Sequence, residues 1–343
     1  MKNKFKKRSS LLLAFLLIIT ALTLPAAAAV RQRPTLLVGG IPFGVRFFTD
    51  GVLVVGYCDV SCGGNAQNPA REAGLRPGDC ICKVNGQKVE TAAALAEIID
   101  KSGGARLTLQ YRREGKEADV CLSPVPCDQD GRLRTGLFVR DSGAGIGTVT
   151  FVSKQNNSFG GLGHGICDGE SGTLIPLARG TVMGVTIAGL NRGAAGAPGE
   201  LKGQFTAQQQ GELLQNTPCG VFGRLEQCPA LPVGELPIAY RNEIHDGAVT
   251  LWCTLDDNIP HEYDAEISAI HRNADGNKCF TVKVTDRELL SRTGGIIQGM
   301  SGSPIIQDGY LIGAVTHVLI GDPTTGYGIF IENMLSNMAA PLS

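Results

Sequence analysis

The sequence predicts a mainly β protein that combines a small α+β domain with a larger all-β domain. Glycine occurs 46 times in 343 residues, whereas aromatic residues make up only 6%. Short apolar runs alternate with glycine-rich turns, most clearly after residue 133. Many short strands with regular turns are typical of barrels and sandwiches. A formal net charge of −1 and few aromatic residues argue against nucleic acid as a partner.

Residues 1–30 have the pattern of a secretory signal peptide or a membrane anchor. Lysines and Arg8 precede an apolar run, which ends in a proline and four alanines at 25–29. A basic start, an apolar middle and a small-residue end are typical of a cleaved signal. The uncharged stretch at 9–30 also has about the 20 residues that span a bilayer. Under both interpretations the rest of the chain lies outside the cytoplasm.

The eleven cysteines are many for an exported protein, and their odd number leaves at least one unpaired. Cys58 with Cys62, and Cys80 with Cys82, lack the spacing of a zinc site, and no histidine lies in the first 160 residues. We therefore expect no metal site. Most cysteines are expected to be small buried residues or to form occasional disulfides, whose pairing the sequence does not specify.

Residues 35–123 are predicted to form a compact α/β domain. Asn85-Gly86 lies between two apolar runs, as in a β-hairpin, and Thr91 is placed to cap a helix that runs to Lys101. The segment A-G-L-R-P-G-D at 73–79, the hairpin and the helix follow one another in the order of a PDZ domain. This part of the chain resembles that family over about 90 residues.

The resemblance to PDZ domains implies a site for an extended peptide or a chain end. The carboxylate-binding loop of the family corresponds to Ile41, Pro42, Phe43, Gly44 and Val45. The alternatives are a spacer of PDZ shape that binds no ligand and an internal brake on a neighbouring peptidase.

Two glycine-rich segments carry the candidate catalytic residues. Ser301 lies between Gly299 and Gly302, and His164 lies in G-L-G-H-G at 161–165. A serine hydroxyl becomes a nucleophile when a base removes its proton and N–H groups stabilise the oxyanion. Ser301 is therefore the candidate nucleophile and His164 the candidate base. The N–H groups of Gly299 and Ser301 are the candidate oxyanion hole.

Other residues compete for these roles. His317, at the end of an apolar strand, has access to the same site, but a structural role is favoured. Ser303 precedes a proline and is also expected to be structural. The remaining histidines lie in polar turns and are expected at the surface: His245, His261 and His271.

The residues alone leave the acid of a catalytic triad open. Asp168 follows His164 closely, and a residue so near rarely points back at the same ring. Asp286 lies before Ser301 in T-D-R-E-L-L, where it is equally suited to cap a helical turn at 287–291. Both remain candidates on physical grounds.

Residues 133–341 resemble the SpoIVB peptidase family. The resemblance rests on G-L-G-H-G-I-C-D at 161–168, on the segment 285–305 around G-M-S-G-S, and on G-A-V-T-H-V-L-I-G-D at 313–322. It implies a chymotrypsin-like β-barrel serine peptidase without a cofactor. By position, His164 is then the base, Asp286 the acid and Ser301 the nucleophile, with Asp168 as the alternative acid.

The resemblance also implies a biological role. The chain would be a self-cleaving signalling endopeptidase, exported into the space between forespore and mother cell. There it would cut a membrane-embedded inhibitory complex and so trigger sigma-factor processing during sporulation. The alternatives are an HtrA-like envelope quality-control protease and a non-catalytic PDZ adaptor. The sequence does not specify the cleavage sites or the oligomeric state.

Overall fold

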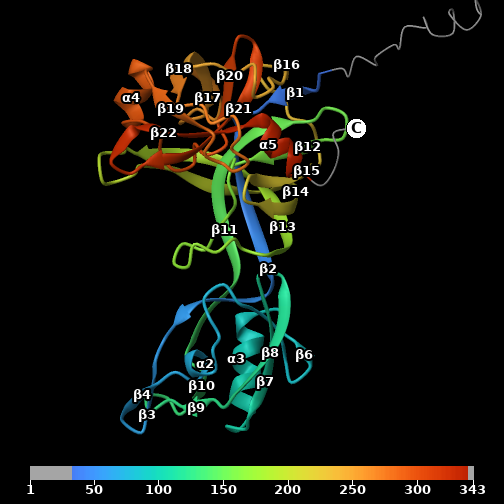
Figure 1. The fold of residues 1–343 in the computed structure, drawn as a ribbon, viewed down its shortest axis with the longest axis vertical. Coiled ribbons are helices and arrows are strands. Elements are labelled where there is room, and N and C mark those ends of the chain that lie inside the picture. Colours follow the sequence, from blue (N-terminus) through green and yellow to red (C-terminus); the bar gives the residue numbers. More distant parts are fainter. Residues whose placement is uncertain (1–32, 339–343) are drawn as a thin grey trace, which may run out of the picture. The chain divides into compact units, whose positions relative to one another are not determined.

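A ring of six paired strands forms the first barrel of the computed structural model, which describes residues 33–338 (Figure 1). The pairings run β2–β11–β12–β15–β14–β13 and return to β2. The bounds are β2 (Pro42–Tyr57), β11 (Leu137–Val152), β12 (Ser158–Gly161), β13 (Leu177–Asn191), β14 (Glu200–Thr217) and β15 (Gly220–Leu225). Two short strands extend this sheet beside β11, namely β1 (Thr35–Val38) and β16 (Glu235–Pro237).

Six further strands close a second barrel, in the order β17–β18–β19–β22–β21–β20. In β18 every second residue from Tyr263 to Ile267 is buried, the alternation expected of a strand with one face on a core. The bounds are β17 (Gly247–Cys253), β18 (His261–Ser268), β19 (Phe280–Val284), β20 (Pro304–Gln307), β21 (Tyr310–Leu319) and β22 (Asp322–Phe330), with the helices α4 (Arg287–Thr293) and α5 (Ile331–Ser336).

The α+β part lies between β2 and β11 in the sequence. The Thr91 hydroxyl accepts a hydrogen bond from the Ala94 N–H and so caps α3, as the sequence predicts. Leu95 and Ile99 form the buried face of that helix. The elements are β3 (Val60–Cys62), β4 (Asn65–Gln67), α2 (Pro69–Glu72), β5 (Cys80–Val84), β6 (Gln87–Lys88), α3 (Ala92–Lys101), β7 (Leu107–Arg113), β8 (Lys116–Leu122), β9 (Val125–Pro126) and β10 (Leu133–Arg134).

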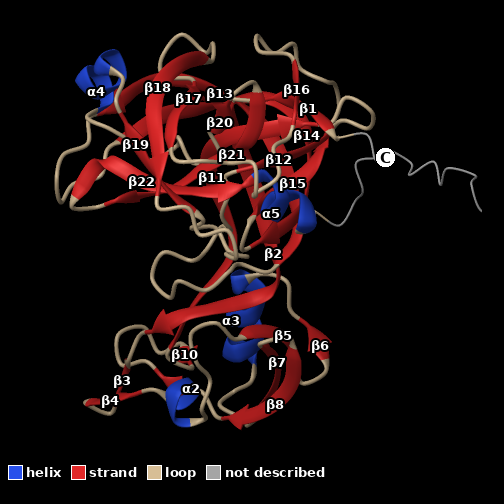
Figure 2. Ribbon diagram, turned by 45° about the horizontal axis from the view of Figure 1, so that its top comes forward, coloured by secondary structure: helices blue, strands red, loops and turns tan. Residues whose placement is uncertain are grey.

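The long strands β2 and β11 belong to both the first barrel and the α+β part (Figure 2). Val45 of β2 pairs with Gly145 of β11 inside the ring, whereas Leu53 of β2 pairs with Cys80 of β5. The structure therefore assigns residues 35–49 to the sheet of the first barrel, whereas the sequence predicted that the PDZ domain begins at residue 35. The alternating apolar residues of β2 are compatible with either sheet, and the strands that pair with them lie about 100 residues or more away.

The expected peptide-binding loop, Ile41, Pro42, Phe43, Gly44 and Val45, is not a loop in the structure. Phe43 and Val45 are only 2% and 3% exposed and pack in the core of the first barrel. Both edges of this segment are occupied, because Val45 faces a partner on β11 and another on β13. An added peptide strand has no free edge here, so this part of the sequence prediction is corrected.

The cysteines form no disulfide in the structure. All eleven are free, and only five are buried: Cys80, Cys127, Cys219, Cys253 and Cys279. Within residues 33–338, no cluster of three or more His, Cys, Asp or Glu side chains is suited to a metal ion. No helix in this range is long and apolar enough to cross a membrane. The expected signal or anchor at 1–30 lies outside the described residues.

Candidate active site

A cavity of about 410 Å³ lies between loops of the two barrels. Ser301 reaches it from the loop before β20, and His164 from the loop after β12. Gly299 and His317 line the same cavity. The structure therefore brings together the candidate nucleophile, the candidate base and the candidate oxyanion hole.

The loop around Ser301 depends on glycine at two positions. Gly299 and Gly302 have φ angles of +98° and +95°, which side chains of L-residues rarely adopt. A Cβ at Gly302 would lie 2.0 Å from the Thr148 carbonyl oxygen. The Gly302 N–H donates to the Val315 carbonyl at 2.8 Å, which ties the loop to β21. The turn exposes the Ser301 hydroxyl, which donates to the Thr316 carbonyl at 2.7 Å.

Thr148 of β11 orients the peptide groups beside Ser301. Its hydroxyl donates to the Gly299 carbonyl at 2.8 Å, and its N–H donates to the Ser301 carbonyl at 3.0 Å. No acceptor among residues 33–338 binds the N–H group of Gly299 or of Ser301. Two unpaired backbone donors beside a serine hydroxyl are suited to hold a negatively charged oxygen.

The His164 ring has a defined tautomer. Its Nδ1 lies 2.9 Å from the Gly165 carbonyl oxygen, which can only accept a hydrogen bond. The proton therefore resides on Nδ1, and Nε2 keeps a lone pair that can accept a proton. Burial lowers the pKa of His164, and the Gly165 carbonyl offsets part of that effect. The neutral form, which a general base requires, is favoured.

Asn216, which the sequence analysis did not single out, holds the histidine loop. Its side-chain oxygen accepts from the Ile166 N–H at 2.8 Å. Its side-chain nitrogen donates to the carbonyls of Ile166 and Ile175 at 2.8 and 2.9 Å. Asparagine before Thr217-Pro218 resembles an ordinary turn in the sequence. No local pattern connects it with a loop fifty residues earlier.

The structure brings neither carboxylate candidate to His164. Asp286 caps α4, where its carboxylate accepts from the Leu289 N–H at 2.8 Å. The buried Asp168 accepts from the N–H groups of Glu170 and Ser171 and from the Ser171 hydroxyl, and Arg140 lies 3.4 Å away. Burial raises the pKa of Asp168, but these hydrogen bonds and the Arg140 charge outweigh it and leave the pKa lowered. The capping role that the sequence offered for Asp286 is the one observed.

His317 lies inside the site rather than in a purely structural position. Its ring centroid is 4.8 Å from that of His164. Its Nδ1 is buried and has no hydrogen-bond partner in the part of the chain that the structure describes. Burial and the charges of His164 and Lys278 lower the pKa of His317 to about 4. Two neutral imidazoles therefore lie side by side near neutral pH.

The remaining rivals lie away from the cavity. His245 forms a hydrogen bond with Asp308 and His261 with Asp257, all at the surface, and His271 is exposed. These positions agree with the surface location that the sequence predicted. Ser303 is fully buried and its N–H donates to the Met300 carbonyl, so it is part of the loop structure.

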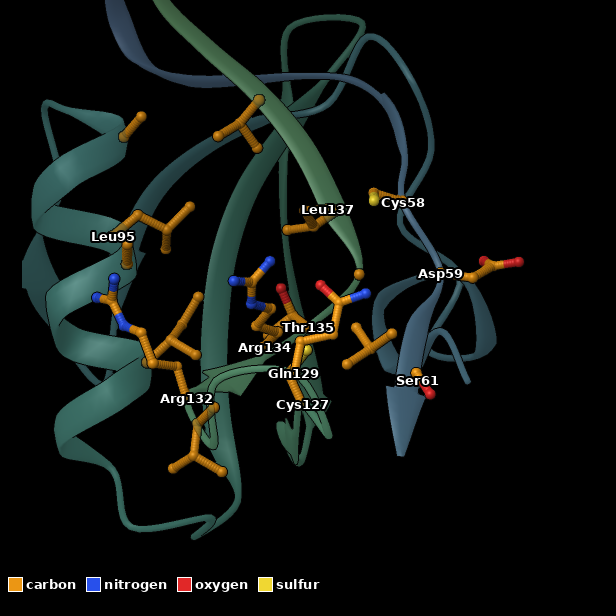
Figure 3. A pocket seen from close by; sticks show the side chains of 17 residues that line it. Cys58, Asp59, Ser61, Leu95, Cys127, Gln129, Arg132, Arg134, Thr135 and Leu137 are labelled. Atoms are coloured by element: carbon orange, nitrogen blue, oxygen red, sulfur yellow. The ribbon is translucent and has the colours of Figure 1, made fainter. Parts of the chain in front are cut away.

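The α+β part carries a second cavity, of about 370 Å³, between α3 and the start of β11 (Figure 3). Leu95 of α3 and Leu137 of β11 line it from opposite sides (Figure 3). Between Leu137 and Val139, β11 pairs with β2 on one edge, and no described strand pairs with the other. This free edge beside a helix has the geometry for an added peptide strand. The segment R-T-G-L-F at 134–138 is the sequence signal that corresponds to it.

Comparison with known proteins places both domains. A model of the SpoIVB peptidase S55 family matches residues 131–335, and a PDZ domain model matches residues 60–113. A probable periplasmic serine protease do/HhoA-like from Haemophilus influenzae is 30% identical over 103 residues, which are 27% of this chain and 22% of that protein. A putative zinc metalloprotease from Mesorhizobium japonicum is 35% identical over 68 residues, which are 20% of this chain and 18% of that protein. The chain spans less than a quarter of the length of these relatives.

Two solved structures match parts of this chain at low similarity. The active form of the Rv3671c protease from M. tuberculosis matches 59% of this chain and 78% of its own, at 14% identity and a TM-score of 0.34. The PDZ domain of an SdrC-like protein from Listeria monocytogenes matches 26% of this chain and 87% of its own, at 21% identity and a TM-score of 0.22. The strand pairings and the two family models confirm the predicted mainly β fold class, a PDZ domain with a β-barrel peptidase domain. Because the SpoIVB peptidase model covers more than half of the chain, the protein belongs to the SpoIVB peptidase S55 family.

Proposed function

We propose that Ser301 is the nucleophile of this endopeptidase and that His164 is its general base. The observation that carries the proposal is the meeting of both side chains in one cavity, beside the unpaired N–H groups of Gly299 and Ser301. The hydroxyl of Ser301 turns from the Thr316 carbonyl towards Nε2 of His164 when a substrate is bound. His164 then takes the hydroxyl proton as the oxygen attacks the scissile carbonyl.

The oxyanion that forms accepts hydrogen bonds from the N–H groups of Gly299 and Ser301. Protonated His164 next donates its Nε2 proton to the leaving amine, and water repeats the sequence on the acyl-enzyme. The Gly165 carbonyl keeps the ring oriented through Nδ1. In this mechanism a backbone carbonyl, rather than Asp286 or Asp168, fixes the tautomer of the base.

The groove between α3 and β11 takes an extended peptide or a chain end. Leu95 and Leu137 would bind its apolar side chains, and the free edge of β11 would pair with its backbone. Arg134 also lines this groove, where its guanidinium forms an ion pair with Asp130 at 2.6 Å. The peptide would come from the substrate or from the N-terminal region of this chain.

The biological role we propose is that of an exported signalling protease of sporulation. It would cleave its own N-terminal region and then cut an inhibitory complex in the membrane between forespore and mother cell. Membership of the SpoIVB family and the basic, then apolar, start of the sequence support this role. The likeness to an HhoA-like periplasmic protease supports the second candidate, envelope quality control.

The test is the mass of the exported protein in a spore-forming host, for wild type, Ser301→Ala and Ser303→Ala. We expect the wild type and Ser303→Ala to lose N-terminal residues and Ser301→Ala to stay long. Identical trimming of all three would assign the cut to another enzyme. In that case Ser301 would remain the proposed nucleophile only if a fluorophosphonate labels the wild type and does not label Ser301→Ala. Indiscriminate digestion of denatured casein would favour quality control over signalling.

A further inference from the structure

We infer that the peptidase site selects a small or medium aliphatic side chain on the acyl side of the scissile bond. This inference rests on the proposed roles of Ser301 and His164. It concerns the chemistry of the cavity wall beside them. The deciding residues belong to the segment 296–298 and to β21.

The wall of the active-site cavity is apolar. Aliphatic side chains line it from both barrels: Val45, Ile146, Leu162, Ile296, Ile297 and Val318. Among residues 33–338, His164, His317 and the Cys167 thiol are the only ionisable side chains that line it, and no acidic residue, lysine or arginine does so. A charged substrate side chain that enters this cavity would lose its hydration without gaining an opposite charge.

Two chain segments flank the position of the substrate side chain on the acyl side of the scissile bond. The scissile carbonyl is fixed between the Ser301 hydroxyl and the Gly299 N–H. Residues 296–298 lead directly into Gly299, and Thr316 of β21 accepts the hydrogen bond from Ser301. A side chain on the attacked carbonyl therefore lies between 296–298 and the next residues of β21, His317 and Val318.

Ile296 limits the depth of this space. Its Cδ1 lies 2.7 Å from the position that a Cβ on Gly326 would occupy, so the isoleucine fills the surface above that glycine. Gly326 pairs with Val318 across β21 and β22, which places it beneath the same wall. Ile296 is 2% exposed and is held by its neighbours. The remaining space suits alanine, valine or leucine better than a bulky aromatic or a long charged side chain.

The experiment uses the full exported chain and peptidyl diphenyl phosphonates that differ only in the side chain next to the phosphonate. These reagents phosphonylate the Ser301 hydroxyl in one step, with loss of phenol, so peptide turnover is not required. We expect the valine reagent to inactivate the wild type about 100-fold faster than the lysine or glutamate reagent, the order of discrimination of a well-matched apolar pocket. Comparable rates with valine and lysine would overturn the inference.

A matched pair of variants tests the location of the pocket. Val318→Asp places a carboxylate in the wall and should raise the rate with the lysine reagent at least about 10-fold, as a new charge pair requires. Val318→Asn has a similar shape without the charge and should lower the valine rate without raising the lysine rate. Equal responses of both variants would place the pocket elsewhere.

A small fluorophosphonate without a peptide side chain distinguishes a failure of the inferred specificity from a failure of the proposed nucleophile. If it labels Ser301 and the reagents show no aliphatic preference, only the specificity is wrong. If it does not label the wild type, the proposed nucleophile is wrong and the inference falls with it.

Discussion

The ring of His317 lies against that of His164, with centroids 4.8 Å apart and planes inclined by 37°. Both rings line the cavity of Ser301, and burial lowers the pKa of each. No hydrogen bond joins the two rings in the described structure. We interpret His317 as a residue that excludes water from the base, and the first prediction tests this.

We predict that His317→Phe retains activity, because phenylalanine keeps the ring contact and the exclusion of water. His317→Ala should instead admit water to His164, which raises its lowered pKa towards 6.5. The acidic limb of the kcat/KM profile should then move to higher pH in the alanine variant and stay in place in the phenylalanine variant. If both variants lose activity equally with an unmoved limb, His317 acts through its nitrogens instead.

A second prediction concerns stability and pH. The folded-state pKa of His317, about 4, lies below the unfolded value near 6.5, so the unfolded chain binds more protons between these values. The free energy of unfolding should therefore fall as pH decreases from 6.5 towards 4. Above pH 6.5, His317 should add no pH dependence to it. His317→Phe should reduce the slope in this window, measured by denaturant unfolding at several pH values. An unchanged slope would assign the effect to other groups, with His164 as the first of them.

Asp286 should contribute to stability rather than to the chemical step. Asp286→Ala removes the cap of α4 and should cost about 1 kcal/mol of unfolding free energy, whereas Asp286→Asn keeps an acceptor and should cost less. The rate of fluorophosphonate labelling should stay near that of the wild type in both variants. A loss of about 10³-fold or more in the asparagine variant, with unchanged stability, would instead return Asp286 to the triad.

Asn216 should control the position of the base without touching substrate. Asn216→Ala leaves the Ile166 N–H and the Ile175 carbonyl without a partner, at a cost of about 1–3 kcal/mol for each buried group left unpaired. The Ile166 carbonyl keeps the hydrogen bond from the Ile175 N–H. We expect slower labelling of Ser301 and faster proteolytic nicking of the histidine loop. Asn216→Asp is the matched control: it keeps the acceptor for Ile166, loses both donors and should show an intermediate nicking rate. Labelling and nicking like the wild type in Asn216→Ala would exclude this role.

The sequence predicted the features that local patterns encode. Glycines around Ser301 and His164 mark the two loops that carry the candidate catalytic residues, because such turns need φ values that few other residues adopt. Thr91 predicted the start of α3, and Asn85-Gly86 predicted the hairpin, where both residues have positive φ. Each of these features is specified by a few adjacent residues.

The features that the sequence did not predict depend on distant pairing. Residues 41–45 have the apolar character of a strand, but only their pairing with β11 and β13 assigns them to the first barrel. With that assignment, the candidate peptide groove lies beside the start of β11 rather than at residues 41–45. His317 and Asn216 act at His164 from about 150 and 50 residues away, a distance that no local pattern bridges.

The shared strands β2 and β11 have a consequence for the order of folding. The PDZ domain is the connection between two neighbouring strands of the catalytic barrel, so a disordered PDZ domain would leave a loop of about 80 residues to close before β2 meets β11. Closing long loops slows folding, whereas a folded insert brings its two ends together in advance. A chain that is synthesised from its N-terminus can complete this insert before most of the barrel is available. The cavity that holds Ser301 and His164 needs strands and loops from both barrels, so it is among the last parts of the molecule to form.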